Sequence, residues 1–218
     1  MEYRVNVPFQ GGTMGATTKR RPMGKDPRIH PAVRIYVLPN GRMPERGSDG
    51  AVAFDVFVRA IVAPHLEPNT PLRKTVFDFR EKPSGFNGYV RLHRPNREGP
   101  EVLAYMLPPK DSIIVGVGFI VEMPFPLCYL VLPKSGLSTV QDIHIINAPA
   151  PVDSDYRGEA GVRLENRSIN PFPIYQGQAI AQILFTRAIM PDFVRKEHYL
   201  DLAPSLRGAH GFGSTTSR

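Results

Sequence analysis

Hydrophobic and polar positions alternate along this chain in short runs, and no long stretch has the periodic Ala, Leu, Glu and Lys content of a helix. Alternation with a period of two is typical of β-strands, because successive side chains point to opposite faces of a sheet. In Ala51–Val62, for example, Phe54, Val56 and Val58 would share one face. Ala179–Ile189 is also expected to be a strand, since it is short, apolar and rich in β-branched residues.

Turn-forming residues interrupt these runs frequently. The chain contains 23 prolines and 19 glycines, which favours many short strands joined by turns. The one helix that the pattern predicts is short, at Ser135–Gln141, where Ser135 would cap the first turn. We therefore predict an all-β fold, a sandwich or barrel of short strands.

Composition divides the 218 residues into three regions. Residues 1–31 are rich in Gly, Thr, Lys and Arg, and we expect a flexible basic N-terminal arm, or one ordered by contact with a neighbouring subunit. Residues 32–200 carry the strand patterns and should form one β domain with its own core. Residues 201–218 would be a Gly-rich C-terminal arm.

Charge and cysteine content narrow the classes of function. The formal net charge of +7 suits nucleic acid or a polyphosphate ligand, but the basic residues form no stripe with interleaved aromatics, which argues against direct nucleic-acid binding. The sequence has no transmembrane run of about 18 apolar residues and no signal-peptide core at its N-terminus. Cys128 lies in an apolar run and is interpreted as a buried thiol in a reducing compartment, so we expect a cytoplasmic protein.

One candidate for binding chemistry is PKSGLS, at Pro133–Ser138. A strand ends there and a helical turn begins. Backbone N–H groups, together with Lys134 and Ser135, could form an anion-binding cradle. A plain strand-to-helix turn is the alternative.

A second candidate is the segment Asn147–Leu164, which contains VDSDYRGEAGV. A strand pair around DYRG would make a hairpin, with Asp153 and Asp155 pointing the same way because they are two residues apart. Like charges on one face repel unless a cation or a basic neighbour compensates them. The segment is therefore either a solvated turn or an acidic site that orients water.

A third candidate is the tail RGAHGFGSTT, at Arg207–Thr216, which is too rich in glycine to pack a core. It is either a disordered C-terminus or a lid. In a lid, Phe212 would stack on a flat ligand while Arg207 and the hydroxyl groups contact phosphate.

In their order along the chain, these segments resemble the five motifs of the trimeric all-β deoxyuridine triphosphatases (dUTPases). The matching segments are Gly50–Val56, Pro133–Ser138, Asn147–Val162, Tyr175–Phe185 and Arg207–Thr215. The resemblance covers residues 32–216 and implies a jelly-roll or β-clip barrel of short strands that assembles as a homotrimer. Active sites would lie at subunit interfaces and be closed by exchanged C-terminal arms.

The resemblance also implies an activity, the hydrolysis of dUTP to dUMP and pyrophosphate. The Asp153 carboxylate would orient and deprotonate the water that attacks the α-phosphorus. Tyr156 would stack under the deoxyribose and exclude a 2′-hydroxyl, and the main chain at Asn147–Val152 would read uracil. Mg²⁺ would be held mainly by the triphosphate and water, with Asp55 contacting it through water. The implied substrate-binding residues are Lys134, Ser135, Gly136, Asn147, Val152, Tyr156, Gln182, Arg207, Phe212, Gly213, Ser214 and Thr215.

Several positions depart from the family's pattern. Lys134 stands where Arg is usual, Ala150 and Pro151 stand where Gly-Thr or Gly-Val is usual, and His210 replaces a common Gly. An insertion of about 40 residues, at roughly 67–106, would be a hairpin over the active-site mouth, a trimer contact or a surface for a protein partner.

Other functions stay open from the sequence. They are hydrolysis of a modified deoxyuridine nucleotide, a dCTP deaminase-like activity, and a dUTPase-fold regulator that binds a protein through the insertion. Deamination requires a glutamate at the base pocket and a basic, serine-rich second motif, where this chain has Asp153 and PKSGLS. A purely non-enzymatic regulator would not need Asp153, Tyr156, Arg207 and Phe212.

Overall fold

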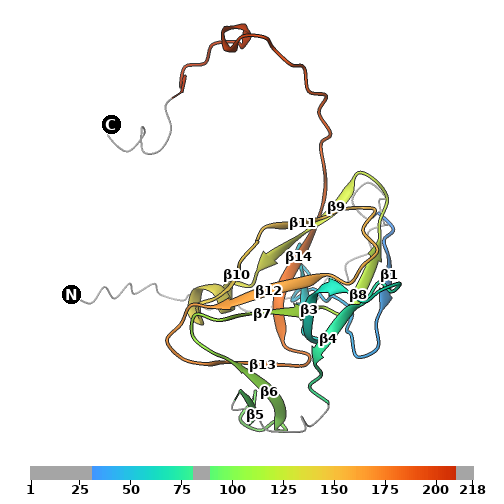
Figure 1. Cartoon of the computed structure of the whole chain (residues 1–218), viewed down its shortest axis with the longest axis vertical. Coiled ribbons are helices and arrows are strands. Elements are labelled where there is room, and N and C mark those ends of the chain that lie inside the picture. The colour runs from blue at the N-terminus through green and yellow to red at the C-terminus, as the bar shows by residue number, and fades with distance from the viewer. Residues whose placement is uncertain (1–30, 81–88, 210–218) are drawn as a thin grey trace, which may run out of the picture. The chain divides into compact units, whose positions relative to one another are not determined.

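The protein is described from a computed structural model, which covers residues 31–80 and 89–209. The chain divides into two units, residues 1–33 and 34–218, and every strand described here lies in the second. As predicted, this unit is all-β (Figure 1). Its strands are β1 (Arg34–Val37), β2 (Phe54–Phe57), β3 (Ala60–Leu66), β4 (Arg73–Phe77), β5 (Val90–His93), β6 (Val102–Leu107), β7 (Ser112–Gly116), β8 (Phe119–Glu122), β9 (Leu127–Pro133), β10 (Ile143–Ile145), β11 (Ala150–Val152), β12 (Gly161–Asn166), β13 (Phe172–Tyr175) and β14 (Ala179–Arg187).

Within the described residues, the strands form four antiparallel sheets. The five-stranded sheet has the order β10-β12-β7-β3-β4, and the four-stranded sheet has the order β11-β9-β14-β2. Strands β13-β6-β5 and β1-β8 form the two smaller sheets. In the four-stranded sheet, β9 and β14 pair from Pro133 opposite Ala181 to Leu127 opposite Arg187.

Buried side chains alternate along the central strands, as the sequence pattern predicts. On β9, Leu127, Tyr129 and Val131 are buried, and on β12 Val162 and Leu164 are buried. Full burial of one such aliphatic side chain stabilises a fold by about 1.5–3 kcal/mol. A slip of one residue would expose the whole set, so burial fixes the register of both strands.

The strand predicted at Ala51–Val62 is in fact two strands, β2 and β3, which belong to different sheets. At the break, the Val58 N–H donates to the Gln178 carbonyl and the Arg59 N–H donates to the Gly116 carbonyl, both at 2.9 Å. The main chain therefore changes its pairing partner between two consecutive residues. Alternation predicts extended backbone, but it does not identify the partner strand.

The region of the predicted insertion adds strands to two sheets. Strand β4 pairs with β3 at the edge of the five-stranded sheet, and β5 pairs with β6, which in turn pairs with β13 (Figure 1). Strand β4 ends at Phe77, whose ring packs edge-to-face on Phe79 with centroids 4.9 Å apart. The region is therefore anchored to the β domain at more than one place.

Two short helical turns accompany the strands. The predicted turn is present as the π-helical η1 (Gly136–Val140), but Ser135 makes no side-chain capping hydrogen bond, so the predicted cap is wrong. Instead, the Ser138 hydroxyl donates to the Lys134 carbonyl at 3.2 Å. A second turn, the 3₁₀-helical η2 (Tyr199–Asp201), was not predicted.

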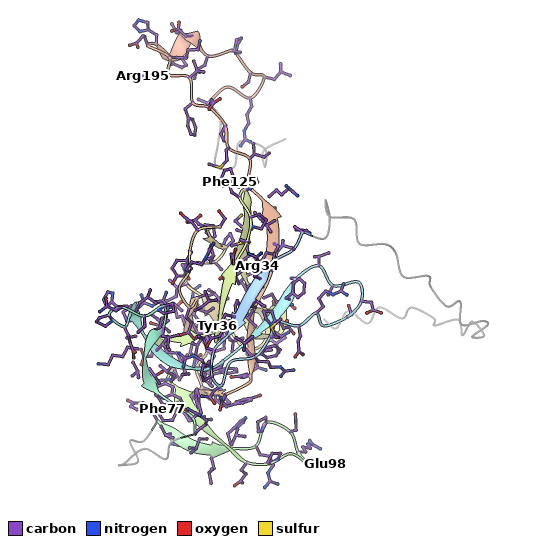
Figure 2. The ribbon with its side chains drawn as sticks, turned by 90° about the vertical axis from the view of Figure 1, so that its right-hand side faces the viewer. Arg34, Tyr36, Phe77, Glu98, Phe125 and Arg195 are labelled. Carbon is purple, nitrogen blue, oxygen red and sulfur yellow. The ribbon has the colours of Figure 1, made fainter. Side chains whose placement is uncertain are left out.

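Beyond β14 the chain continues as residues 188–209, all of which are exposed. The Ala188 N–H donates to the Pro126 carbonyl at 2.9 Å, next to the start of β9. Figure 2 labels Phe125 at this point and Arg195 farther along the segment. We refer to residues 188–209 as the C-terminal segment.

Candidate active site

Three polar side chains from distant parts of the sequence meet at one end of the four-stranded sheet. The Lys134 ammonium lies 2.7 Å from Asp55 Oδ2, and the Gln182 amide donates to Asp55 Oδ1 at 3.0 Å. The Asp55 side chain is 17% exposed and that of Lys134 is 30% exposed. We call Asp55, Lys134 and Gln182 the polar cluster.

Strand register explains why these residues meet. Gln182 of β14 pairs with Asp55 of β2 on one side and with Leu132 of β9 on the other. Strand β9 ends at Pro133, so Lys134 follows the end of the strand, two positions after Leu132. The cluster therefore follows from the pairing of three strands, and it unites three of the predicted site residues.

The turn after Lys134 only partly resembles the predicted anion cradle. The N–H groups of Leu137 and Ser138 both donate to the Lys134 carbonyl at 3.0 Å. Any cradle is thus restricted to the backbone N–H groups of Ser135 and Gly136, the two predicted phosphate-binding positions. Both residues are exposed beside the polar cluster.

The predicted hairpin around DYRG is wrong. Strand β11 pairs with β9, whereas β12 pairs with β7 and β10, so residues 153–160 cross from one sheet to the other. Strand β11 ends at Val152, and the Tyr156 N–H donates to the Asp153 carbonyl at 3.3 Å, which places the turn before Arg157–Gly158. We call residues 153–160 the crossover segment.

Asp153 and Asp155 are both exposed within the crossover segment, and Tyr156 is half-buried. Because β11 ends before them, the two carboxylates do not share a strand face as predicted. The Tyr156 hydroxyl donates to the Glu159 carbonyl oxygen at 3.1 Å. Burial raises the pKa of the Tyr129 hydroxyl on β9, and Tyr156 adds to the effect electrostatically.

Glu159 is the buried anchor of the crossover segment, with an exposed fraction of 0%. Arg59 holds its carboxylate with Nε on Oε1 at 2.7 Å and Nη2 on Oε2 at 2.8 Å. Backbone N–H groups of Gly118 and Arg73 donate to the same carboxylate at 3.0 and 3.3 Å. The third carboxylate of VDSDYRGEAGV is therefore structural.

The roles of Arg59 and Arg73 in this anchor were not predicted from the sequence. A signal was present in RGEAG, where small residues flank a lone glutamate. A Cβ on Gly158 would lie 2.5 Å from the Tyr156 hydroxyl oxygen, and a Cβ on Gly161 would lie 2.7 Å from Arg73 Nε. The glycines therefore make room for a tightly packed charged core.

The polar cluster and the crossover segment are far apart within one chain. Val152 on β11 pairs with Tyr129 of β9, whereas Asp55 on β2 is in register with Leu132 of β9 through Gln182 of β14. Val152 and Asp55 are therefore offset by three residues along the strand direction and by three strands across the sheet. At about 3.3 Å per residue and about 4.8 Å per strand, the Cα atoms of Val152 and Asp55 are roughly 17 Å apart. Asp153 lies one residue beyond Val152, so a single chain does not bring Asp153 to the polar cluster.

The remaining predicted residues lie in three places. Asn147 is exposed just before β11, and Val152 lies on β11, an edge strand of the four-stranded sheet. Arg207 is exposed in the C-terminal segment. Phe212, Gly213, Ser214 and Thr215 lie outside the described residues, as does His210.

In residues 31–80 and 89–209, no group of three or more His, Cys, Asp or Glu side chains is arranged to hold a metal ion. Over the same part of the chain, no helix is long and apolar enough to cross a membrane.

Comparisons with known proteins converge on one family. The dUTPase family model matches residues 102–216. A deoxyuridine 5′-triphosphate nucleotidohydrolase from Cytophaga hutchinsonii is 39% identical over 112 residues, which are 51% of this chain and 71% of that protein.

Solved structures give the same result for the fold. The dUTPase of Staphylococcus bacteriophage 80alpha, determined with dUpNHpp, is 18% identical with a TM-score of 0.57, covering 85% of this chain and 98% of that chain. A variant dUTPase of phage phi11 of S. aureus, which coordinates a structural Mg(II) ion, is 15% identical with a TM-score of 0.53, covering 77% and 98%.

Proposed function

The chain belongs to the dUTPase family, and we propose that it hydrolyses dUTP to dUMP and pyrophosphate by attack of water on the α-phosphorus. The observation that carries this proposal is the polar cluster. Asp55, Lys134 and Gln182 come from three of the motifs that resemble the family, and the polar atoms of Lys134 and Gln182 each lie within 3.0 Å of an Asp55 carboxylate oxygen.

The polar cluster would bind the triphosphate. The Lys134 ammonium supplies a positive charge, and the N–H groups of Ser135 and Gly136 supply donors for phosphate oxygens. The Gln182 amide would hold Asp55 in place, as it does in the structure at 3.0 Å. Lys134 offers a point charge where a family arginine would offer two parallel donors.

The donor set fits a magnesium ion carried by the substrate. Asp55 is the carboxylate of the polar cluster, and both of its oxygens already accept hydrogen bonds. One such carboxylate suits contact through an ion-bound water better than direct chelation. When bound, Mg²⁺ would neutralise charge on the phosphates, and Asp55 would orient its water.

Asp153 would act on the attacking water. Its carboxylate is exposed at the start of the crossover segment, where it can accept a proton from water. The new bond forms between this water oxygen and the α-phosphorus, the bond from the α-phosphorus to the bridging oxygen breaks, and pyrophosphate leaves. Positioning and charge neutralisation supply most of the rate enhancement in such reactions.

Tyr156 and β11 would select the nucleoside. The Tyr156 ring would lie under the deoxyribose and leave no space for a 2′-hydroxyl. Asn147–Val152 would read the base along the free edge of β11, where Pro149 and Pro151 have carbonyl groups but no N–H. Carbonyl acceptors suit the N3–H donor of uracil.

Assembly as a homotrimer would complete the site. Asp153 of one chain lies far from its own polar cluster, so a second copy has to supply it. The C-terminal segment leaves large apolar side chains exposed, as expected of a segment that packs on another subunit. These side chains are Ile189, Met190, Phe193, Val194, Tyr199, Leu200, Leu202 and Leu206. Beyond them, Arg207, Phe212, Gly213, Ser214 and Thr215 would close over the nucleotide.

The activity is tested by incubating the protein with each deoxynucleoside triphosphate and Mg²⁺ and measuring pyrophosphate release. We expect release from dUTP, and a loss of at least 100-fold in kcat for Asp153→Asn with nucleotide binding retained, as for removal of a general base. Release of no pyrophosphate from any deoxyuridine nucleotide would refute the proposal.

The shared site is tested by subunit complementation. Asp153→Asn and Asp55→Asn are each expected to be inactive as homotrimers. Mixed trimers, formed by co-refolding the two variants, contain sites that take both intact carboxylates from different chains. Recovery of activity on mixing supports the interface site. No recovery, in mixed trimers verified by mass spectrometry, would place both carboxylates in one chain.

A further inference from the structure

The insertion contacts the crossover segment directly. The Glu159 N–H donates to the carbonyl of Pro71, just ahead of β4, at 2.8 Å. On β4 itself, Arg73 Nε donates to the Glu159 carbonyl oxygen at 3.0 Å, and the Arg73 N–H donates to Glu159 Oε2 at 3.3 Å. The Arg73 guanidinium also donates to the Pro64 carbonyl on β3. Arg73 therefore joins two strands of the five-stranded sheet to the crossover segment.

Arg73 and Tyr156 donate to the same atom. The Glu159 carbonyl oxygen accepts one hydrogen bond from Arg73 Nε at 3.0 Å and another from the Tyr156 hydroxyl at 3.1 Å. A carbonyl oxygen has two lone pairs, so the two donors fill its capacity. The Tyr156 ring is thus linked to Arg73 on the inserted strand by hydrogen bonds to one shared oxygen.

Close packing leaves little freedom around this oxygen. The Tyr156 hydroxyl lies against Gly158, and the Arg73 guanidinium lies against Gly161, each at a distance that a Cβ would not permit. The Glu159 carboxylate is fixed in turn by Arg59. Since its neighbours are held, Tyr156 has the geometry of a preorganised contact rather than of a mobile surface ring.

We propose that Arg73 is a positioning residue, through which the inserted strand β4 fixes Tyr156 and so sets the selection of deoxyribose over ribose. This inference rests on the proposed function, which places Tyr156 under the sugar. Arg73 touches no reacting atom. Its loss should loosen the tyrosine ring, weaken nucleotide binding and admit a 2′-hydroxyl, with a smaller effect on the water attack.

The test compares steady-state kinetics on dUTP and UTP for the full chain and for variants at neighbouring positions of β4. Arg73→Ala removes both side-chain hydrogen bonds, and Arg73→Lys keeps the charge but replaces the forked guanidinium with a single ammonium group. Lys74→Ala is the matched control, because it removes a positive charge from the next, exposed position of the same strand. Loss of one charged hydrogen bond corresponds to roughly tenfold or more in binding.

For Arg73→Ala we expect KM for dUTP to rise about tenfold and the dUTP-to-UTP ratio of kcat/KM to fall about tenfold, with kcat within about threefold of the unaltered chain. Arg73→Lys should recover part of both effects, and Lys74→Ala should change neither. A merely structural role would lower the amount of folded enzyme and hence the apparent kcat, and would leave KM and the ratio unchanged.

A double-mutant cycle keeps the proposal testable even if Arg73→Ala folds poorly. Arg73→Lys and Tyr156→Phe each disturb a donor to the same oxygen, so their effects on the dUTP-to-UTP ratio should be non-additive. Additive effects, or a wild-type ratio in Arg73→Ala, would overturn the inference. An unaltered chain that fails to hydrolyse dUTP would instead overturn the proposed function.

Discussion

The substitution Glu159→Gln tests whether a buried carboxylate holds the crossover segment. The Glu159 side chain is fully buried, and four donors converge on it. Arg59 Nε and the Gly118 N–H donate to Oε1, while Arg59 Nη2 and the Arg73 N–H donate to Oε2. A glutamine keeps the shape but replaces one oxygen with an NH₂ group, so two donors then face a donor in either amide orientation.

The expected cost follows from these contacts. Each lost charge-assisted hydrogen bond contributes about 1.5–3 kcal/mol, and two are lost. The substitution also leaves the guanidinium of Arg59, 11% exposed, without its counter-ion. Breaking a buried ion pair from one side typically costs about 3–5 kcal/mol. We therefore expect Glu159→Gln to lower the free energy of unfolding by about 3–5 kcal/mol, a large share of the roughly 5–15 kcal/mol of a typical domain.

Urea denaturation followed by circular dichroism and tyrosine fluorescence measures this change, since the chain has no tryptophan. The protomer concentration has to be fixed, because the stability of an oligomer depends on it. Glu122→Gln is the control: its ion pair with Arg34 at 2.7 Å is exposed, and its removal should cost less than about 1 kcal/mol. A loss for Glu159→Gln no larger than that of the control would refute the buried anchor.

Two further predictions concern the C-terminal segment and the buried tyrosine. Deleting the residues after Pro204 should lower kcat/KM for dUTP by about 100-fold or more, while light scattering should still show a trimer, because the arm closes the site rather than holding the subunits together. Full activity in the truncated protein would contradict the lid. The raised pKa of Tyr129 means that its stabilising effect is complete below the unfolded-state pKa of 10.0 and is lost as the pH rises above it. Between pH 9 and 11, ionisation of Tyr129 in the unfolded state should lower the unfolding free energy of the unaltered chain by about 1.4 kcal/mol. Tyr129→Phe should lack this loss, and identical pH profiles for the two proteins would contradict the prediction.

Local patterns predicted the fold class, and the resemblance of five motifs to one family selected the members of the polar cluster. Alternation and frequent turns are properties of neighbouring residues, so the all-β class could be predicted, as could a strand at Ala179–Ile189. Asp55, Lys134 and Gln182 were selected by the order of motifs along the chain, and strand pairing brings them together. Their mutual hydrogen bonds were not predicted, because register between distant strands cannot be read from either strand alone.

Only the tertiary structure decided which carboxylate of VDSDYRGEAGV is buried. The local pattern predicted a hairpin, and the family resemblance singled out Asp153 among its carboxylates. The fold makes the segment a crossover between two sheets, leaves Asp153 exposed and buries Glu159. The partner of Glu159 is Arg59, 100 positions away, and it reaches the carboxylate because the chain changes sheets between Val58 and Arg59. Burial of a charge depends on which distant residue can neutralise it. That pairing is a property of the folded chain and is absent from the local pattern.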